Sequence, residues 1–167
     1  EVSQPQPTPD GRAFLFLCNR AWPGKYELCR LELDGDRVHE LTDLSGVEGY
    51  ALSPDARQLL VTYSGSYLPT QLAVLPADGG SVTLLTDTRS AAFKAHDWIA
   101  PQIVQVPSQH GAGSIWAKYY GPARMEPGKK YPIVMFVHGA GYLQNVHLQY
   151  PAYSASRCST TCWCSTA

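Results

Sequence analysis

The sequence lacks the features that mark three large classes of protein. It has no apolar run near the roughly 20 residues that a membrane-spanning helix needs, so we expect no membrane-spanning segment. Charged residues make up only 16% of the chain and the net charge is −1, which gives no electrostatic basis for binding nucleic acid. The cysteines form no C-x-x-C pair, and no histidine follows Cys162 or Cys164. We therefore expect no metal site and no other cofactor.

Two further absences concern catalysis and the start of the chain. No G-x-S-x-G sequence occurs, because Gly65-Ser66 and Gly113-Ser114 lack the required spacing. The nucleophile elbow of an α/β-hydrolase is therefore missing from these 167 residues. The first residue is Glu1, and residues 1–12 have neither a basic start nor an apolar signal core. We expect the natural N-terminus to lie upstream, and the sequence assigns no compartment.

The sequence is rich in strand-forming and turn-forming residues. Hydrophobic residues make up 44%, and there are 14 glycines and 13 prolines, a composition typical of a turn-rich β protein. Two copies of one pattern follow each other at an offset of 44 to 45 residues: residues 9–17 match 54–62, and residues 26–43 match 70–87. A period of this length with several short strands is the size of one four-stranded propeller blade.

Each copy predicts the same order of strands. A Pro-Asp-Gly or Pro-Asp-Ala turn comes first. Three strands follow, at 14–18, 27–33 and 38–41 in the first copy and at 59–63, 71–75 and 82–85 in the second. A small meander sandwich with coincidental similarity is the alternative to blades. Cys18 and Cys29 fall on neighbouring predicted strands, either as a disulfide or as buried free thiols.

The pattern changes after residue 87. Residues 88–102 form a connector, and two strands are predicted at 102–106 and 114–120, separated by a loop with two glycines. A third strand at 133–137 is apolar throughout, which is typical of a strand covered on both faces in an α/β sheet.

The third predicted strand runs directly into His138-Gly139-Ala140-Gly141. In α/β-hydrolases one N–H of the oxyanion hole comes from the loop after the third strand, and small residues are needed because the substrate carbonyl approaches the backbone closely. We therefore predict that these four residues form an oxyanion loop. His138 is expected to act within the loop, because the triad histidine follows the nucleophile in chain order. The other histidines have no partnering motif and are expected to be surface or structural residues: His39, His96, His110 and His147.

The order of these features resembles the prolyl oligopeptidase family of serine peptidases, and especially its dipeptidyl-peptidase-IV-like bacterial branch. The likeness lies in "SPDAR" and "LLTDT" within the repeats, then "KYPIVMFVHGAGY" and "YPAY", and it covers residues 8–153. It implies a mixed fold, in which two β-propeller blades at 1–90 are followed by the first strands of an α/β-hydrolase domain at 91–153. It also implies hydrolysis of short peptides, often after Pro or Ala near the N-terminus, through an acyl-enzyme. For an intact enzyme, short peptide substrates and a homodimer are the partners that this resemblance allows.

Several family features have no direct counterpart. The dipeptidyl-peptidase-IV pattern places a tyrosine hydroxyl donor just after the third strand, where this chain has His138. The N–H of Gly139 or Ala140, or the imidazole of His138, would have to take that role. The paired glutamates that hold the free amine of a dipeptidyl substrate have no recognisable counterpart. The Ser, Asp and His of the triad would all follow residue 167, so we expect the chain to be inactive as it stands.

Residues 154–167 differ from everything before them. They have no periodicity, and they carry three cysteines and a Ser/Thr cluster where the hydrolase fold places an amphipathic helix. Residues 155–165 can be encoded by a nucleotide sequence that has a second meaning in another reading frame. When that sequence is read from two nucleotides later, it encodes Glu-Gln-Met-Phe-Asn-Asn-Leu-Leu-Val-Gln, which has apolar residues at helical spacing. We interpret 154–167 as an out-of-frame tail, and an ordinary disordered or disulfide-bearing C-terminus is the alternative.

Two other functions stay open at this point. The partial blades can form a protein-binding module without catalysis. A complete esterase-like hydrolase with Ser108 or Ser114 as nucleophile is the other alternative, which the chain order disfavours.

Overall fold

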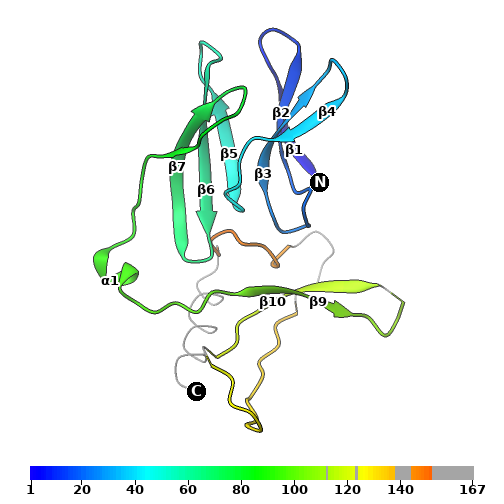
Figure 1. The fold of residues 1–167 in the computed structure, drawn as a ribbon, viewed down its shortest axis with the longest axis vertical. Helices are drawn as coiled ribbons and strands as arrows, with labels where there is room; N and C mark the ends of the chain where they lie inside the picture. The colour runs from blue at the N-terminus through cyan, green and yellow to red at the C-terminus, as the bar shows by residue number, and fades with distance from the viewer. Residues whose placement is uncertain (112, 123, 138–143, 152–167) are drawn as a thin grey trace. The chain divides into compact units, whose positions relative to one another are not determined.

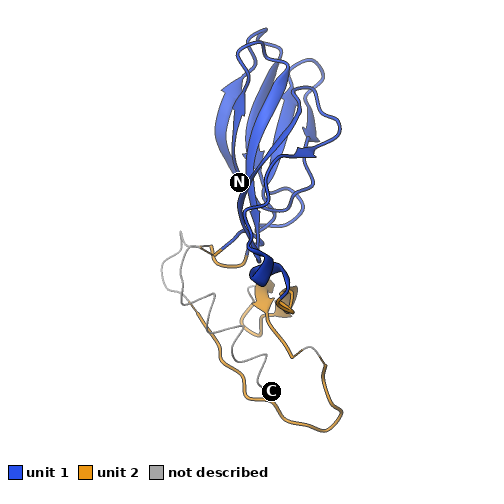
Figure 2. Ribbon diagram, turned by 90° about the vertical axis from the view of Figure 1, so that its left-hand side faces the viewer, with its two compact units in different colours: residues 1–95, 147–150 blue, residues 96–146, 151–167 orange. Residues whose placement is uncertain are grey.

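The computed structural model of the protein describes residues 1–111, 113–122, 124–137 and 144–151. The chain divides into two compact units (Figure 2): unit 1 comprises Glu1–Ala95 and His147–Tyr150, and unit 2 comprises His96–Val146 and Pro151–Ala167. Unit 1 contains two four-stranded antiparallel sheets, and the described part of unit 2 contains a two-stranded hairpin (Figure 1). No helix among the described residues is long and apolar enough to cross a membrane.

The first sheet covers the first copy of the repeat. It is formed by β1 (Val2–Pro7), β2 (Ala13–Cys18), β3 (Glu27–Glu32) and β4 (Arg37–Glu40), which are hydrogen-bonded in that order. All three pairings are antiparallel. Between β3 and β4 the chain turns with positive φ at Gly35 and Asp36, a conformation that glycine and aspartate tolerate better than other residues.

The second sheet covers the second copy and has the same topology. Its strands are β5 (Val47–Leu52), β6 (Gln58–Gly65), β7 (Leu68–Pro76) and β8 (Thr83–Leu84), again in sequence order and antiparallel. The three strands predicted in each copy are confirmed. The first strand of each sheet, β1 or β5, was not predicted, because β1 contains Pro5 and Pro7, and β5 contains Gly49 and a bulge. Proline and glycine weaken a strand pattern and are tolerated at a sheet edge.

The turn before the second strand of each sheet is built from the same hydrogen bonds. In the first copy the Thr8 hydroxyl donates to the Asp10 carboxylate at 2.6 Å, and that carboxylate accepts the Arg12 N–H at 3.1 Å. In the second copy the Ser53 hydroxyl donates to Asp55, also at 2.6 Å, and Asp55 accepts a backbone N–H two residues later. These hydrogen bonds hold the pKa of both carboxyl groups below the usual range.

A buried polar residue occupies the same position in both sheets but differs in chemistry. The Glu27 carboxylate accepts the Thr42 hydroxyl at 2.6 Å and the N–H groups of Leu44 and Ser45 at 3.0 and 2.6 Å. The corresponding Gln71 accepts the Thr86 hydroxyl at 2.8 Å through its carbonyl oxygen.

The Gln71 side chain also carries an NH₂ group, whose two hydrogens need acceptors. Its Nε2 donates to Pro69 O and to Thr88 Oγ1, both at 2.7 Å. Each buried side chain therefore satisfies its own set of backbone and hydroxyl groups.

The two sheets of unit 1 pack face to face through one apolar joint. It is built from buried residues of both sheets: Leu15, Leu17, Leu28, Val47, Leu59, Val61, Leu75 and Ala77. Polar contacts also cross the joint. The Tyr50 hydroxyl lies 2.5 Å from Gln4 O and 2.8 Å from Leu15 O, so its single hydrogen has two carbonyl acceptors on the first sheet. Burial raises the pKa of Tyr50 to about 12. Arg30 donates to Ala77 O at 3.1 Å.

The structure resolves the two interpretations of the early cysteines. Cys18 on β2 and Cys29 on β3 are joined in a disulfide, with their Cα atoms 6.1 Å apart. Both residues are buried, so the prediction of buried positions is confirmed, and the free-thiol alternative is wrong. Neighbouring antiparallel strands bring the two side chains to the same face of the sheet.

A single helical turn, α1 (Ala91–Lys94), follows the second sheet and is capped by Ser90. In unit 2, β9 (Gln102–Pro107) pairs antiparallel with β10 (Ser114–Tyr119). The hairpin predicted from the sequence is therefore confirmed.

The predicted third strand of the second half is wrong in this structure. Residues 133–137 lie outside every strand, and each side chain is between 74% and 83% exposed. An interior strand needs hydrogen-bonding partners on both edges and a covered face on each side. Among the described residues no strand pairs with this segment. Residues 154–167 lie outside the described part of the chain, so the out-of-frame interpretation stays a prediction.

Ala56 and Gly11 occupy equivalent turn positions, with φ of 57° and 68°. An alanine in this left-handed region costs roughly 1 kcal/mol, whereas glycine does not carry that penalty. We expect Ala56→Gly to raise the free energy of unfolding by about 0.5 kcal/mol or more, and Gly11→Ala to lower it by about 1 kcal/mol. Nothing lies within 4 Å of a Cβ added at Gly11, so φ alone sets its effect. Urea unfolding measures both, and changes of the same sign would contradict the prediction.

Glu27 and Gln71 should not be interchangeable despite their equivalent positions. In Glu27→Gln, the new amide NH₂ replaces a carboxylate oxygen that accepts a backbone N–H from Leu44 or Ser45, so two donors face each other. In Gln71→Glu, a carboxylate oxygen replaces the amide that donates to Pro69 O, so two acceptors face each other. We expect each substitution to lower the free energy of unfolding by about 1–3 kcal/mol at neutral pH, because a buried group loses its partner. Gln58→Glu at an exposed position of β6 is the control, with an expected effect under about 0.5 kcal/mol. Equal stability of all three variants would rule out this account.

Candidate functional site

The predicted oxyanion loop itself lies outside the described residues. His138, Gly139, Ala140 and Gly141 all fall within 138–143, so the structure reports neither their backbone geometry nor their neighbours. The structure does describe the segment that follows. Four residues of it, His147–Tyr150, belong to unit 1.

The segment after the predicted loop is hydrogen-bonded to the second sheet. The Tyr150 N–H donates to Ser64 Oγ at 2.9 Å, and the Gln149 side chain donates to Val47 O at 3.1 Å. A longer contact of 3.4 Å joins the Ser66 hydroxyl to Leu148 O. We call residues 147–150 the anchor segment. Its contacts lie at the ends of β5 and β6 where the two strands pair.

The anchor segment is received by a small polar network on β5, β6 and β7. Ser64 is 1% exposed, and its hydroxyl donates to the Glu48 carboxylate at 2.5 Å. Thr70 donates to the other oxygen of Glu48 at 2.9 Å. The Ser64 Oγ therefore has a fixed orientation, with its lone pair available to the Tyr150 N–H.

Gly46 is needed beside this network because the backbone approaches closely. A Cβ at Gly46 would lie 2.2 Å from Ser64 O and 3.4 Å from the Gln149 Cγ. The Gly46 carbonyl also accepts the Ser64 N–H at 2.9 Å. A side chain at position 46 would therefore push β6 and the anchor segment away.

The chemistry of Ser64 is that of a structural anchor. A serine becomes a nucleophile when an adjacent base takes its proton, whereas the Ser64 hydroxyl donates to a carboxylate and accepts from an amide. The network positions a chain segment, and nothing in its geometry indicates bond cleavage.

The alternative nucleophiles Ser108 and Ser114 flank the turn of the β9–β10 hairpin. Ser108 Oγ accepts the backbone N–H of His110 at 3.2 Å, as in a local turn, and Ser114 begins β10 opposite Pro107. Over residues 1–111, 113–122, 124–137 and 144–151, no hydrogen bond from a histidine side chain to either hydroxyl is recorded. Within the described part of the chain, neither serine therefore has a histidine base.

A possible metal-ligand group, Cys18, Cys29 and Glu40, has its ligand atoms within 4.8 Å of one another. Metal binding by cysteine requires a free thiolate. The disulfide uses both sulfur atoms, so this group does not fit a metal ion.

Comparisons with known proteins agree with the resemblance seen in the sequence. No family model matches the chain. The probable dipeptidyl-aminopeptidase B of Aspergillus clavatus is 23% identical over 150 residues, which are 84% of this chain and 16% of that protein. The protein of the same name from Neosartorya fischeri is 24% identical over 136 residues, which are 78% of this chain and 15% of that protein. The chain thus spans only about a sixth of the length of these curated relatives.

Solved structures show the same fold. The dipeptidyl peptidase 4 of Porphyromonas gingivalis matches with a TM-score of 0.74 at 19% identity, over 90% of this chain and 22% of that one. The ligand-free isopeptidase AtxE2 matches with a TM-score of 0.57 at 16% identity, over 79% of this chain and 20% of that one. The prediction of propeller-like antiparallel sheets in the first half is confirmed.

The sequence did not reveal the polar network or the anchor segment. Ser64 and Tyr150 are 86 positions apart in the chain, and neither belongs to a local motif. Gly46 and the "YPAY" segment were the available signals, because a glycine inside a repeat often marks close backbone approach.

Loss of the Ser64 hydroxyl should release the anchor segment. We expect Ser64→Ala to speed hydrogen exchange of the Tyr150 amide by about fivefold, because the amide loses an acceptor worth about 1 kcal/mol. Exchange mass spectrometry of a peptide that covers residues 144–151 measures the change. Ser81→Ala, at an exposed position before β8, is the control and should leave exchange unchanged. Unaltered protection of Tyr150 in Ser64→Ala would show that the bond has no role.

Proposed function

We propose that this chain is part of a dipeptidyl-peptidase-IV-like serine peptidase of the prolyl oligopeptidase family, which hydrolyses short peptides. The observation that carries the proposal is the sequence similarity to a probable dipeptidyl-aminopeptidase B over 84% of the chain, because a match of that extent cannot be confined to the repeats at 1–90. The fold match to dipeptidyl peptidase 4 supports it.

In this proposal the two sheets at 1–90 are adjacent blades of a β-propeller, and 91–153 is the start of an α/β-hydrolase domain. The support for adjacent blades is the pair of sheets with identical topology and equivalent turn hydrogen bonds, joined face to face. A propeller of about 4–8 blades would surround the access route to the active site, so that only short peptides reach it.

The chemical contribution that we propose for this chain is oxyanion stabilisation. As the bond to the nucleophile forms, the carbonyl oxygen of the substrate gains negative charge, and an N–H from Gly139 or Ala140, or from the His138 imidazole, would donate to it. The nucleophile, general base and orienting acid would come from outside residues 1–167, so the chain by itself would not cleave peptides. The anchor segment would support the loop by fixing the chain from His147 on, six positions after Gly141.

A protein-binding module without catalysis is the second candidate. The observation that favours it is an open apolar groove on the first sheet, lined by Phe14, Phe16 and Leu31 among others. Exposed apolar surfaces of this kind are typical of protein–protein contacts.

A fluorophosphonate probe, which reacts with activated serines, tests the proposed function. We expect no labelling of the 167-residue chain. The second sample is the longer product obtained when the reading frame of the gene is shifted by two nucleotides after codon 154. We expect the probe to label this product, and we expect it to release dipeptides from peptides that have Pro or Ala as the second residue. A reading frame that is intact through residues 154–167 would contradict the out-of-frame tail. Labelling of the 167-residue chain at Ser108 or Ser114 would instead support the esterase alternative.

A further inference from the structure

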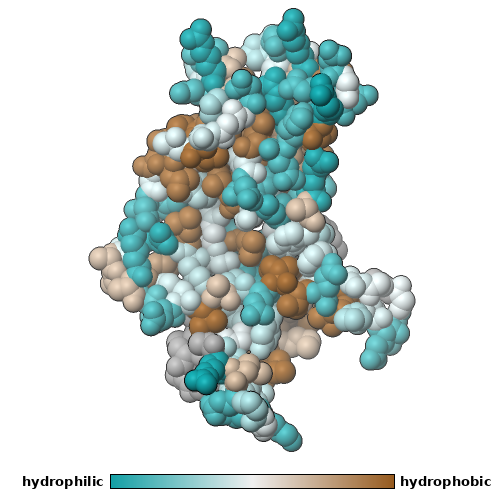
Figure 3. Space-filling model, viewed as in Figure 1, coloured by the Kyte–Doolittle hydropathy of each residue, from teal (hydrophilic) through white to brown (hydrophobic). Residues whose placement is uncertain are grey.

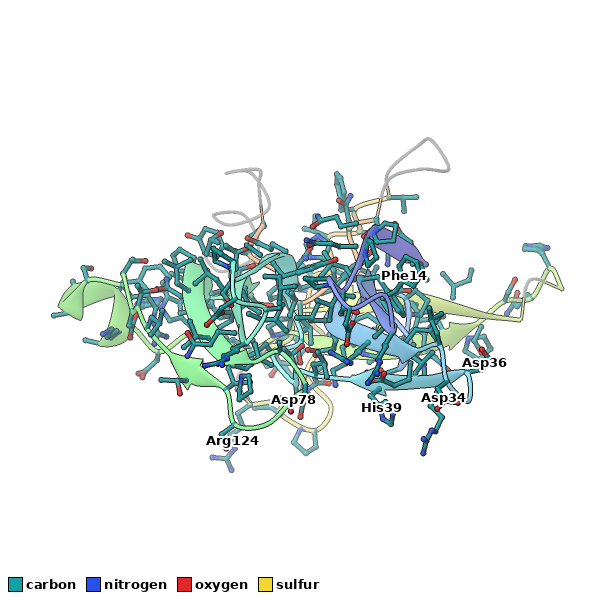
Figure 4. All side chains as sticks on the ribbon, turned by 90° about the horizontal axis from the view of Figure 1, so that it is seen from above. Phe14, Asp34, Asp36, His39, Asp78 and Arg124 are labelled. Carbon is teal, nitrogen blue, oxygen red and sulfur yellow. A yellow bond between two sulfur atoms is a disulfide. The ribbon has the colours of Figure 1, made fainter. Side chains whose placement is uncertain are left out.

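The two copies of the repeat differ at the ends of the sheets where the anchor segment binds. At the opposite ends they keep the same chemistry, because Asp34 and Asp78 occupy equivalent positions in the turns after β3 and β7, and both are exposed (Figure 4). Figure 1 shows these turns at the upper ends of the sheets, and Figure 3 shows mainly hydrophilic residues there. Chain reversal and contact with water are sufficient to explain that end of both copies.

The second sheet continues beyond the point at which the first sheet ends. β6 has eight residues where β2 has six, and β7 has nine where β3 has six. Gly65 and Leu68 pair with each other in the added part, whereas residues 19–26 of the first copy lie outside β2 and β3. The added part carries the two serines that contact the anchor segment, Ser64 and Ser66.

The polar network that receives the anchor segment is not repeated in the first copy. At the repeat offset of 44 to 45 residues, other residues occupy the equivalent positions: Glu48, Ser64 and Thr70 correspond to Ser3, Asn19 and Tyr26. The Asn19 amide donates to Pro23 O at 2.7 Å, so it closes its own loop. A four-stranded sheet of this topology therefore forms without the network, and the network has a second role beyond the sheet.

We propose that Glu48 is a positioning residue of the active site, an inference that rests on the proposed function. The Glu48 carboxylate accepts the hydroxyl hydrogens of Ser64 and Thr70, so Ser64 Oγ turns a lone pair toward the Tyr150 N–H. This hydrogen bond fixes the chain that follows the proposed oxyanion loop. Glu48 contacts neither the substrate nor the reacting atoms, and it acts only through Ser64 and Tyr150.

This role gives a specific kinetic effect. An oxyanion donor acts on charge that develops only as the bond to the nucleophile forms, so its displacement lowers kcat more than it weakens substrate binding. Loss of the Glu48 hydrogen bonds should lower kcat by about tenfold and leave KM within about twofold.

Two substitutions of Glu48 separate its hydrogen bonds from its charge. Glu48→Met removes both acceptor oxygens at a similar side-chain length. Glu48→Gln keeps a carbonyl oxygen for the Ser64 hydroxyl, and its NH₂ group can donate to Thr70 Oγ1 because a hydroxyl also accepts. We therefore expect Glu48→Met to show the tenfold loss of kcat and Glu48→Gln to keep kcat within about twofold of the unsubstituted enzyme.

A double-mutant cycle tests whether Glu48 acts through Ser64. Ser64→Ala should lower kcat by about tenfold, and Glu48→Met added to it should lower kcat no further, because the two residues act in one chain of contacts. The measurement uses the longer product described above, and kcat is calculated per active site titrated with the fluorophosphonate probe, so that an unfolded fraction does not count. Ser53→Ala removes hydroxyl contacts at the other end of β6 and is the control, with an unchanged kcat. An unchanged kcat in Glu48→Met, or a further loss in the double variant, would overturn the proposal.

Hydrogen exchange of the 167-residue chain separates a failure of this inference from a failure of the proposed function. A longer product that neither reacts with the probe nor cleaves peptides would contradict the proposed function. Independently of that result, Glu48→Met should speed exchange of the Tyr150 amide by about threefold, and Glu48→Gln should leave it unchanged. Equal exchange in Glu48→Met and the unsubstituted chain would show that Glu48 does not position the anchor segment, whatever the activity of the longer product.

Discussion

The apolar joint between the two sheets is the interaction on which the rest of unit 1 depends. A single antiparallel sheet of four short strands leaves apolar side chains on both faces and is stable only when at least one face is covered. Leu15 and Leu28 on one side and Val47, Leu59 and Leu75 on the other cover each other. The hydrogen bonds of Tyr50 and Arg30 across the joint then fix which residues meet, because a shifted pairing would leave buried polar groups without partners.

The repeat preserves geometry more strictly than chemistry. The turn before the second strand uses Thr8 in one copy and Ser53 in the other, and each makes the same two hydroxyl contacts. Glu27 and Gln71 differ more, since one only accepts and the other also donates. In each copy a different local set of donors and acceptors satisfies equivalent backbone groups. The topology is therefore identical although the sequences of the two copies differ.

The anchor segment gives the sheets a structural part in any function of the second half. Ser64 and Val47 receive Tyr150 and Gln149, which follow the predicted oxyanion loop closely in the chain. Reactive or binding loops work when a rigid element holds their ends. The buried ends of β5 and β6 are such an element, and the Glu48 carboxylate keeps the Ser64 hydroxyl in one orientation.

The sequence by itself determined three strands of each sheet, for example β2 and β6, and the hairpin of β9 and β10. These strands could be predicted because their apolar runs and turn residues are local signals. It also predicted the oxyanion loop and the order of the two halves. Only the tertiary structure decided that Cys18 and Cys29 form a disulfide, that β1 and β5 complete each sheet, and that Ser64 meets Tyr150. It also overturned the buried strand at 133–137, since an apolar run forms an interior strand only where other strands offer it hydrogen bonds and cover.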